Sequence, residues 1–150
     1  MIDIGNRIVS LRNTTNIAFK ESRVIFNFNS PAEINNSLIS SYSYCDTYDE
    51  TIKISIFEKA LKKNFIIPSI CTIDSILSGK HKYRMVNLDN ITEINFDIHN
   101  TRIRFNMNTF IETNVKYKDI YSNDFVYWTF LSKDDFEKEM RVLKNLVKDN

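Results

Sequence analysis

Two stretches of this chain resemble each other along their whole length. VSLRNTTNIAFKESRVIFNFN occupies residues 9–29, and VNLDNITEINFDIHNTRIRFNMN occupies residues 86–108. An offset of 77 residues aligns their first halves, and an offset of 79 aligns the rest after a two-residue insertion. The offset of 79 then continues to a shared FEK tripeptide at 57–59 and 136–138. This pattern predicts an internal duplication of a unit of roughly 70–75 residues.

Each unit has the pattern of four strands followed by a helix. In the second unit, short apolar runs predict strands at 84–88, 91–99 and 102–108, with Asn100-Thr101 at a hairpin tip. The strand at 102–108 alternates apolar and polar residues, as a half-buried strand does. The predicted fold class is therefore α+β: an internally duplicated ββββα unit whose antiparallel sheets pack with two main helices.

The second unit ends in a strongly patterned helix. Ser132 is the expected N-cap, and Asp134 and Asp135 place negative charge at the positive end of the helix dipole. Apolar residues then recur at helical spacing: Phe136, Met140, Leu143 and Val147. In the first unit Lys53 stands at the expected cap position, so that helix is predicted to be short and to stop before Pro68.

The pattern predicts a single domain over 1–150. Its two repeats cover about 5–65 and 82–147, and an apolar connector at 66–81 joins them. The connector has Gly79 as a helix stop and three apolar residues at helical spacing, Ile70, Ile73 and Leu77. A linker between independent domains would be polar and flexible, so both units are expected to share one core.

Charge and cysteine usage limit the possible partners. Lys plus Arg (20) nearly balances Asp plus Glu (19), and neither half of the chain is a basic arm, which argues against a strongly electrostatic nucleic-acid or membrane binder. Cys45 and Cys71 have no metal or redox spacing and are expected to be buried thiols in a reducing compartment. Because no signal peptide or membrane-spanning stretch is present, the expected location is the cytoplasm.

No residue pattern announces catalysis. His81 and His99 lack neighbours at metal-ligand spacing, and the two glycines, Gly5 and Gly79, build no phosphate-binding loop. Helix capping accounts for the adjacent aspartates of the last helix. The chain is therefore expected not to be an enzyme, with no catalytic residues, no metal and no cofactor.

Two polar surfaces are candidate nucleic-acid contacts. One is the outward face of the repeated hairpin, made by Arg23, Asn27, Asn29, Arg102, Arg104, Asn106 and Asn108, whose donors could meet phosphates or base edges. The other is the basic run at 79–84, with Lys80, Lys82 and Arg84. An ordinary solvated strand face and a soluble connector are the favoured interpretations of the two.

A third surface is apolar, and here the units differ. In FVYWTFL (125–131), Val126, Trp128 and Phe130 share one face, whereas an offset of 79 places Thr47, Asp49 and Thr51 there in the first unit. The favoured interpretation is a central strand with both faces covered. The alternative is an exposed patch that binds a protein partner or a second copy of the chain.

Two resemblances add to this pattern. VNLDNITEI, followed by a hairpin and YWTFLSKDDFEKEM, resembles small uncharacterised bacterial and phage proteins over most of 84–147 and, more loosely, 7–65. These proteins bring no established activity. In architecture alone, a doubled four-strand-and-helix unit is similar to the PC4, Whirly and Pur-alpha class, which implies single-stranded nucleic-acid binding.

Two hypotheses of function follow. The leading one is a non-catalytic interaction protein, of inhibitor, immunity or accessory type, that binds an unidentified protein or itself through Val126, Trp128 and Phe130. The alternative is a single-stranded nucleic-acid-binding protein whose contacts are basic: Arg23, Lys80, Lys82, Arg84, Arg102 and Arg104. Neither hypothesis involves a membrane.

Overall fold

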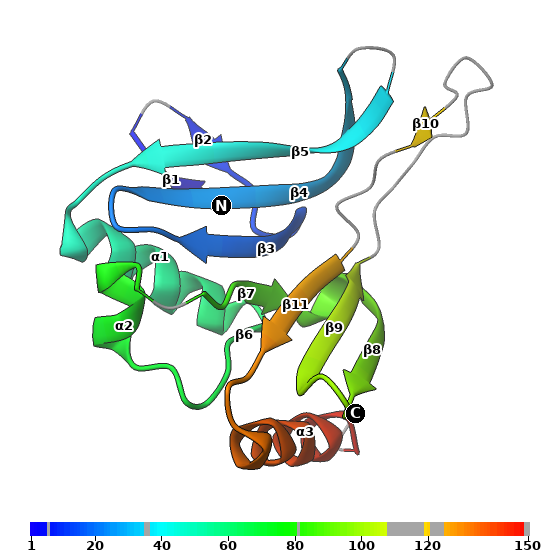
Figure 1. Cartoon of the computed structure of the whole chain (residues 1–150). Helices are drawn as coiled ribbons and strands as arrows, with labels where there is room; N and C mark the ends of the chain where they lie inside the picture. Colours follow the sequence, from blue (N-terminus) through cyan, green and yellow to red (C-terminus); the bar gives the residue numbers. More distant parts are fainter. Residues whose placement is uncertain (6, 35–36, 81, 108–118, 121–124, 149–150) are drawn as a thin grey trace.

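The computed structural model describes residues 1–5, 7–34, 37–80, 82–107, 119–120 and 125–148 (Figure 1). Its elements form an α+β fold with largely antiparallel sheets and three α-helices, two of them long. Three of the sequence-based expectations, those for His81, for Asn108 and for the strand end at 108, lie outside the described residues.

The first sheet is built on a meander of long strands. Six strands lie in the order β10 (Asp119–Ile120), β5 (Ser37–Asp46), β4 (Arg23–Ile34), β3 (Thr14–Phe19), β7 (Met85–Asn87) and β6 (Phe65–Ile66). All neighbours are antiparallel except β10 and β5, which pair in parallel. A small hairpin of β1 (Ile2–Asp3) and β2 (Ile8–Val9) precedes this sheet.

The second sheet is a three-stranded antiparallel meander. Its strands lie in the order β11 (Phe125–Thr129), β9 (Arg102–Met107) and β8 (Ile91–Asp97), and a 3-10 turn, η1 (Leu88–Asn90), leads into β8. The predicted alternation is confirmed, because Ile103, Phe105 and Met107 are buried while the residues between them are half-exposed. The predicted hairpin tip is also confirmed by a turn over residues 98–101.

The helix caps correct one expectation and confirm another. The hydroxyl of Ser132 accepts a hydrogen bond from the backbone N–H of Asp135 (3.3 Å) at the start of α3 (Lys133–Lys148). In α1 (Glu50–Lys62), however, the cap is Asp49, whose carboxylate accepts from the N–H of Thr51 (2.9 Å). The expectation of a short helix with its cap position at Lys53 was wrong, since the helix begins one turn earlier and runs for 13 residues. The expected stop before Pro68 is confirmed, because the helix ends at Lys62.

Lys53 is buried instead, with 1% of its surface exposed. Its ammonium donates hydrogen bonds to the carbonyl oxygens of Glu21 (2.5 Å) and Leu77 (2.9 Å). These carbonyls belong to the β3–β4 turn and to the end of α2 (Ile73–Ser78). Lys53 therefore ties α1, α2 and the first sheet together, because a buried charge needs such partners.

The connector contains a tight packing point. Gly79 ends α2 with φ +69°, a conformation that favours glycine. A Cβ at this position would lie 2.2 Å from the backbone nitrogen of Glu21, so the turn and the helix end touch directly. The buried side chain of α2 is Ile76, whereas Ile73 is exposed, because only one side of this short helix faces the first sheet and α1. Ile70, which precedes the helix, is exposed as well.

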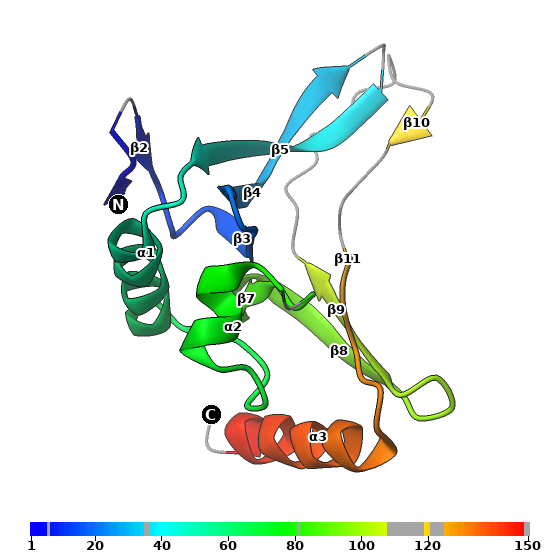
Figure 2. The ribbon, with the colours of Figure 1, turned by 60° about the vertical axis from the view of Figure 1, so that its left-hand side comes forward.

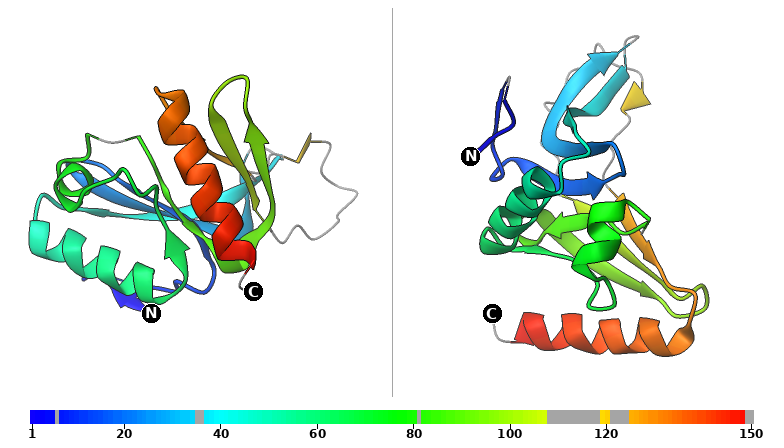
Figure 3. Two further views of the ribbon diagram at one scale, coloured as in Figure 1. Left: turned by 90° about the horizontal axis from the view of Figure 1, so that it is seen from below. Right: turned by 90° about the vertical axis from the view of Figure 1, so that its left-hand side faces the viewer.

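The hydrophobic side chains form two clusters, so the expectation of one shared core was wrong. The first lies between the six-stranded sheet and α1, and the second lies between the three-stranded sheet and α3 (Figures 1 and 3). Consecutive residues of β7 join them, because Met85 belongs to the first cluster and Val86 to the second. Figure 2 shows β7 between β3 of the first sheet and strands β8 and β9.

We expect Lys53→Met to lower the free energy of unfolding by about 3 kcal/mol or more. It removes two hydrogen bonds from a charged donor, each worth roughly 1.5–3 kcal/mol, and leaves two carbonyls without that partner. Urea unfolding measures the change. The matched control is Lys59→Met on the exposed side of the same helix, for which a change within about 0.5 kcal/mol is expected. Equal losses in both variants would contradict the anchoring role.

Candidate interaction surface

The side chains predicted to form an apolar patch lie in the second core. Val126, Trp128 and Phe130 are 4%, 0% and 2% exposed. The Trp128 ring meets Phe105 edge-on with centroids 4.5 Å apart, and its Nε1–H donates to the carbonyl oxygen of Arg84 (2.9 Å). The exposed-patch prediction was therefore wrong for these residues, because α3 and β9 cover this side of β11.

Strand β11 also differs from the favoured interpretation of a central strand. It is the edge of its sheet, and its residues alternate between exposed and buried. Phe125 and Tyr127 point outward and are 50% and 44% exposed. The side opposite α3 is here called the outer face; its residues are Glu93, Asn95, Asp97, Arg102, Arg104, Asn106, Phe125 and Tyr127.

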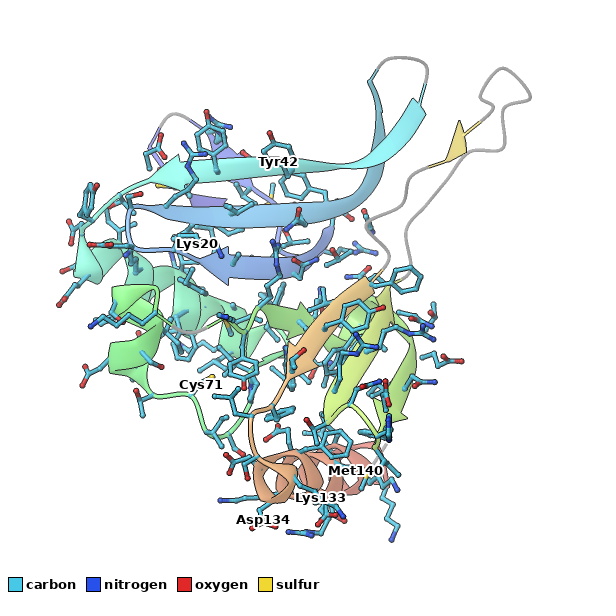
Figure 4. All side chains as sticks on the ribbon, in the orientation of Figure 1. Lys20, Tyr42, Cys71, Lys133, Asp134 and Met140 are labelled. Carbon is cyan, nitrogen blue, oxygen red and sulfur yellow. The ribbon has the colours of Figure 1, made fainter. Side chains whose placement is uncertain are left out.

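Sequence reasoning missed the exposed aromatics because both sides of 125–131 are apolar. The sequence feature that could have revealed them is the last helix, α3, because its single apolar stripe can cover only one side of the strand at 125–131. That stripe is in place: Phe136 and Leu143 are buried, and Met140 lies on the α3 side that packs against the second core (Figure 4).

Each arginine of the outer face lies between an aromatic ring and a carboxylate. The guanidinium of Arg102 stands 4.7 Å from the Tyr127 ring centre, and that of Arg104 stands 5.4 Å from the Phe125 ring centre. Arg102 Nη2 pairs with Asp97 Oδ2 at 3.3 Å, and Arg104 Nη2 lies 3.9 Å from Glu93 Oε1. Both guanidiniums are thus held in place, and their charges are balanced on the face itself.

A residue of the hairpin tip also holds Asp97 in place. Asn100 donates to its carboxylate from both the side chain (2.8 Å) and the backbone (3.2 Å). These hydrogen bonds, followed by Arg102, lower the pKa of Asp97. The carboxylate that orients Arg102 is therefore ionised throughout the neutral range.

The first sheet carries a similar arrangement. The guanidinium of Arg23 lies 4.0 Å from the ring centre of Tyr44, and its Nε is 2.6 Å from Asp46 Oδ1. The hydrogen bond to Asp46 raises the pKa of Arg23. Beside them Tyr42 is 58% exposed on β5 (Figure 4). An arginine between a ring and a carboxylate thus occurs on both sheets.

The six predicted basic contacts do not share one face. Arg102 and Arg104 stand together on β9, whereas Arg23 lies on β4 of the other sheet. Lys80 and Lys82 are exposed in the connector. Arg84 turns inward, where its Nη1 donates to Asn16 Oδ1 (3.0 Å). The structure brings together only the pair on β9.

The two cysteines are free and half-buried rather than fully buried. Burial, followed by the charge of Glu139, raises the pKa of Cys71 to about 11. Glu139 is itself buried and accepts hydrogen bonds from Ser69, from the backbone N–H (3.0 Å) and from the hydroxyl (2.7 Å). This carboxylate therefore fastens the connector to α3. Figure 4 labels Cys71 in the connector.

Comparisons with family models, with curated proteins and with solved structures found no match. Within the described ranges, no three His, Cys, Asp or Glu side chains are placed to hold a metal ion. Among the described helices, none has the length and apolar character needed to cross a membrane. A function is therefore inferred from the side chains of the outer face.

We expect Cys71 to react slowly with iodoacetamide in the folded protein. In a Cys45→Ser variant, the alkylation rate should reach half its plateau near pH 11 when folded and near about 8.5 in urea. Because the folded pKa is the higher one, this thiol contributes no pH dependence below about pH 8. It lowers stability as the pH rises from about 9 to 11. A folded half-plateau near 8.5 would contradict the burial argument.

Proposed function

We propose that this protein is a non-catalytic interaction protein, of inhibitor, immunity or accessory type, that binds a protein partner through the outer face. The observation that carries the proposal is the pair of exposed rings, Phe125 and Tyr127, packed against Arg104 and Arg102. Aromatic residues and arginine are the types enriched at the energetic centres of protein interfaces.

The fixed geometry of the face supports this proposal. Arg102 and Arg104 are each held between an aromatic ring and a carboxylate, so their side chains do not swing freely in water. Side chains held in place lose little conformational entropy when a partner arrives. Exposed Leu131, which follows β11, and Ile98, at the hairpin tip, add apolar area beside the face.

Single-stranded nucleic-acid binding is the second candidate. Phe125 and Tyr127 stand on a sheet surface, where bases can stack on them. The charges favour a protein instead, because Asp97 and Glu93 sit beside the two arginines and repel phosphates. The formal net charge of the whole chain is only +1.

We also propose that the two meanders arose by duplication. Both first hairpins shift register at the same place, between Thr14 and Asn16 in one and between Ile91 and Glu93 in the other. In each hairpin the residue without a partner in the strand register is a threonine, Thr15 in the first and Thr92 in the second.

The hydroxyls of these threonines make matching bonds. Thr15 donates to the carbonyl of Asn27 and Thr92 to that of Asn106, each at 3.2 Å. The last strands pair differently from the sequence alignment, because Cys45 lies opposite Val24 where Trp128 lies opposite Ile103. The counterpart of Trp128 is therefore Cys45 rather than Asp49.

We expect Phe125→Ala and Tyr127→Ala to weaken partner binding while the protein stays folded. Truncating a central interface residue costs about 2 kcal/mol or more, which is roughly 30-fold in affinity. The partner would be recovered with the tagged full chain from the native host, identified, purified and titrated by biolayer interferometry. Tyr48→Ala, which removes an exposed ring outside the face, is the matched control and should bind normally. Unchanged affinity in both face variants would contradict the proposal.

Comparing the stability of Trp128→Ala with that of Tyr127→Ala distinguishes a residue needed for folding from one needed for binding. This substitution empties the second core and should cost about 3–5 kcal/mol of stability. By contrast, Tyr127→Ala should cost less than about 1 kcal/mol, because it is a surface change. Thermal unfolding of the two variants measures the difference, and equal losses would show that Tyr127 is needed for the fold rather than for binding.

Fluorescence anisotropy with labelled single-stranded DNA and RNA tests the second candidate. On the protein-partner proposal, no binding is expected at physiological salt. Micromolar or tighter binding that weakens with salt and is lost in Tyr127→Ala would reject that proposal in favour of nucleic acid.

A further inference from the structure

A small polar hollow lies where β11 begins beside the first sheet. Its lining residues are Asn16, Asn27, Arg84, Phe125 and Val126, and its volume is about 190 Å³. Since a water molecule takes up roughly 30 Å³, this space fits a small ion with a few waters. It is distinct from the outer face except at Phe125, which borders both.

Arg84 is the charged group of this hollow. Its side chain is half-buried, and its Nη1 donates to the amide oxygen of Asn16 (3.0 Å). No carboxylate lines the hollow within the described ranges, and no ion pair there involves Arg84. Removal from water lowers the pKa of Arg84. A partly desolvated cation without a counter-charge is costly.

The arginines of the strands are paired differently from Arg84, which precedes β7. Arg23, Arg102 and Arg104 each lie within 4 Å of a carboxylate oxygen. All three stand on more open surfaces, where an ion pair is worth least. Arg84, in the more enclosed position, has only an amide. Its guanidinium therefore has no counter-charge among the described residues.

The amides around Arg84 are already committed to one another. Asn16 Oδ1 accepts from Asn27 Nδ2 (2.9 Å) as well as from Arg84, and Asn16 Nδ2 donates to Thr15 Oγ1 (3.0 Å). The amide network thus holds the guanidinium at the hollow. Its remaining N–H groups have no acceptor in the part of the chain that the structure describes.

We propose that this hollow binds a small oxoanion, a phosphate or carboxylate group, on the guanidinium of Arg84. Planar arrays of N–H donors match the paired oxygens of such groups, so arginine holds them through two hydrogen bonds. Phe125 borders the hollow and limits the ligand to a small group or the end of a larger one.

The protein carries its own reporter for this site. Trp128 is the single tryptophan, and its indole N–H is bonded to the carbonyl of Arg84 itself. A ligand that shifts Arg84 should therefore change the tryptophan fluorescence.

The test is a fluorescence titration of the full chain with inorganic phosphate and, separately, acetate, against chloride at constant ionic strength. We expect a saturable change in the wild-type protein and an affinity at least about tenfold lower in Arg84→Gln. Lys82→Gln removes the same charge from an exposed neighbour and should bind as the wild type does. A response to phosphate alone would identify a phosphate ligand, and a response to acetate alone a carboxylate ligand; either supports the proposal.

Asn16→Asp provides a second variant in case Arg84→Gln does not fold. It places a carboxylate on the guanidinium in the place of the amide oxygen, so it should abolish the anion response. No saturable response to either anion in the wild type would overturn the proposal. An equal response in the wild type and both site variants would also overturn it. A negative result in this titration would not bear on the proposed binding of a protein partner at the outer face, because no partner is present in the experiment.

Discussion

Strand β7 is the constraint on which the rest of the structure depends. It is three residues long, yet it pairs with β3 on one side and β6 on the other, and its side chains enter both cores. Successive residues of a strand point to opposite faces, so a slip of one residue would exchange Met85 and Val86 between the cores. The indole of Trp128 holds the residue just before this strand, which fixes the second sheet to the first.

Buried polar groups explain how the layers stay in register. Lys53 is satisfied by two carbonyls, and Glu139 by the N–H and hydroxyl of Ser69. Each ties a helix to a distant segment, because a buried charged group is costly unless it has hydrogen-bond partners. Arg84 follows the same rule only in part, because its partner is an uncharged amide. That difference separates a structural anchor from a candidate binding group.

The outer face illustrates how tertiary context divides similar residues. Trp128 and Tyr127 are adjacent and both aromatic, but one lies in the core and the other covers an arginine at the surface. Packing on Phe105, within the cluster that also holds Phe136 of α3, places the indole in the interior. The phenol remains outside, where it shields Arg102 and where a partner can reach it. The proposed interaction surface is thus the reverse side of the strand that builds the second core.

The sequence by itself determined the local patterns: the α+β class, the alternation of β9, the hairpin tip at Asn100-Thr101 and the cap and apolar stripe of α3. These depend on residues close together in the chain, whose periodicity and turn chemistry are readable directly. Only the tertiary structure decided which side of β11 is buried, that there are two cores, and that Arg84 turns inward. Those outcomes depend on α3, β7 and Asn16, which approach from distant parts of the chain, and an apolar run has no polar side to reveal its orientation in advance.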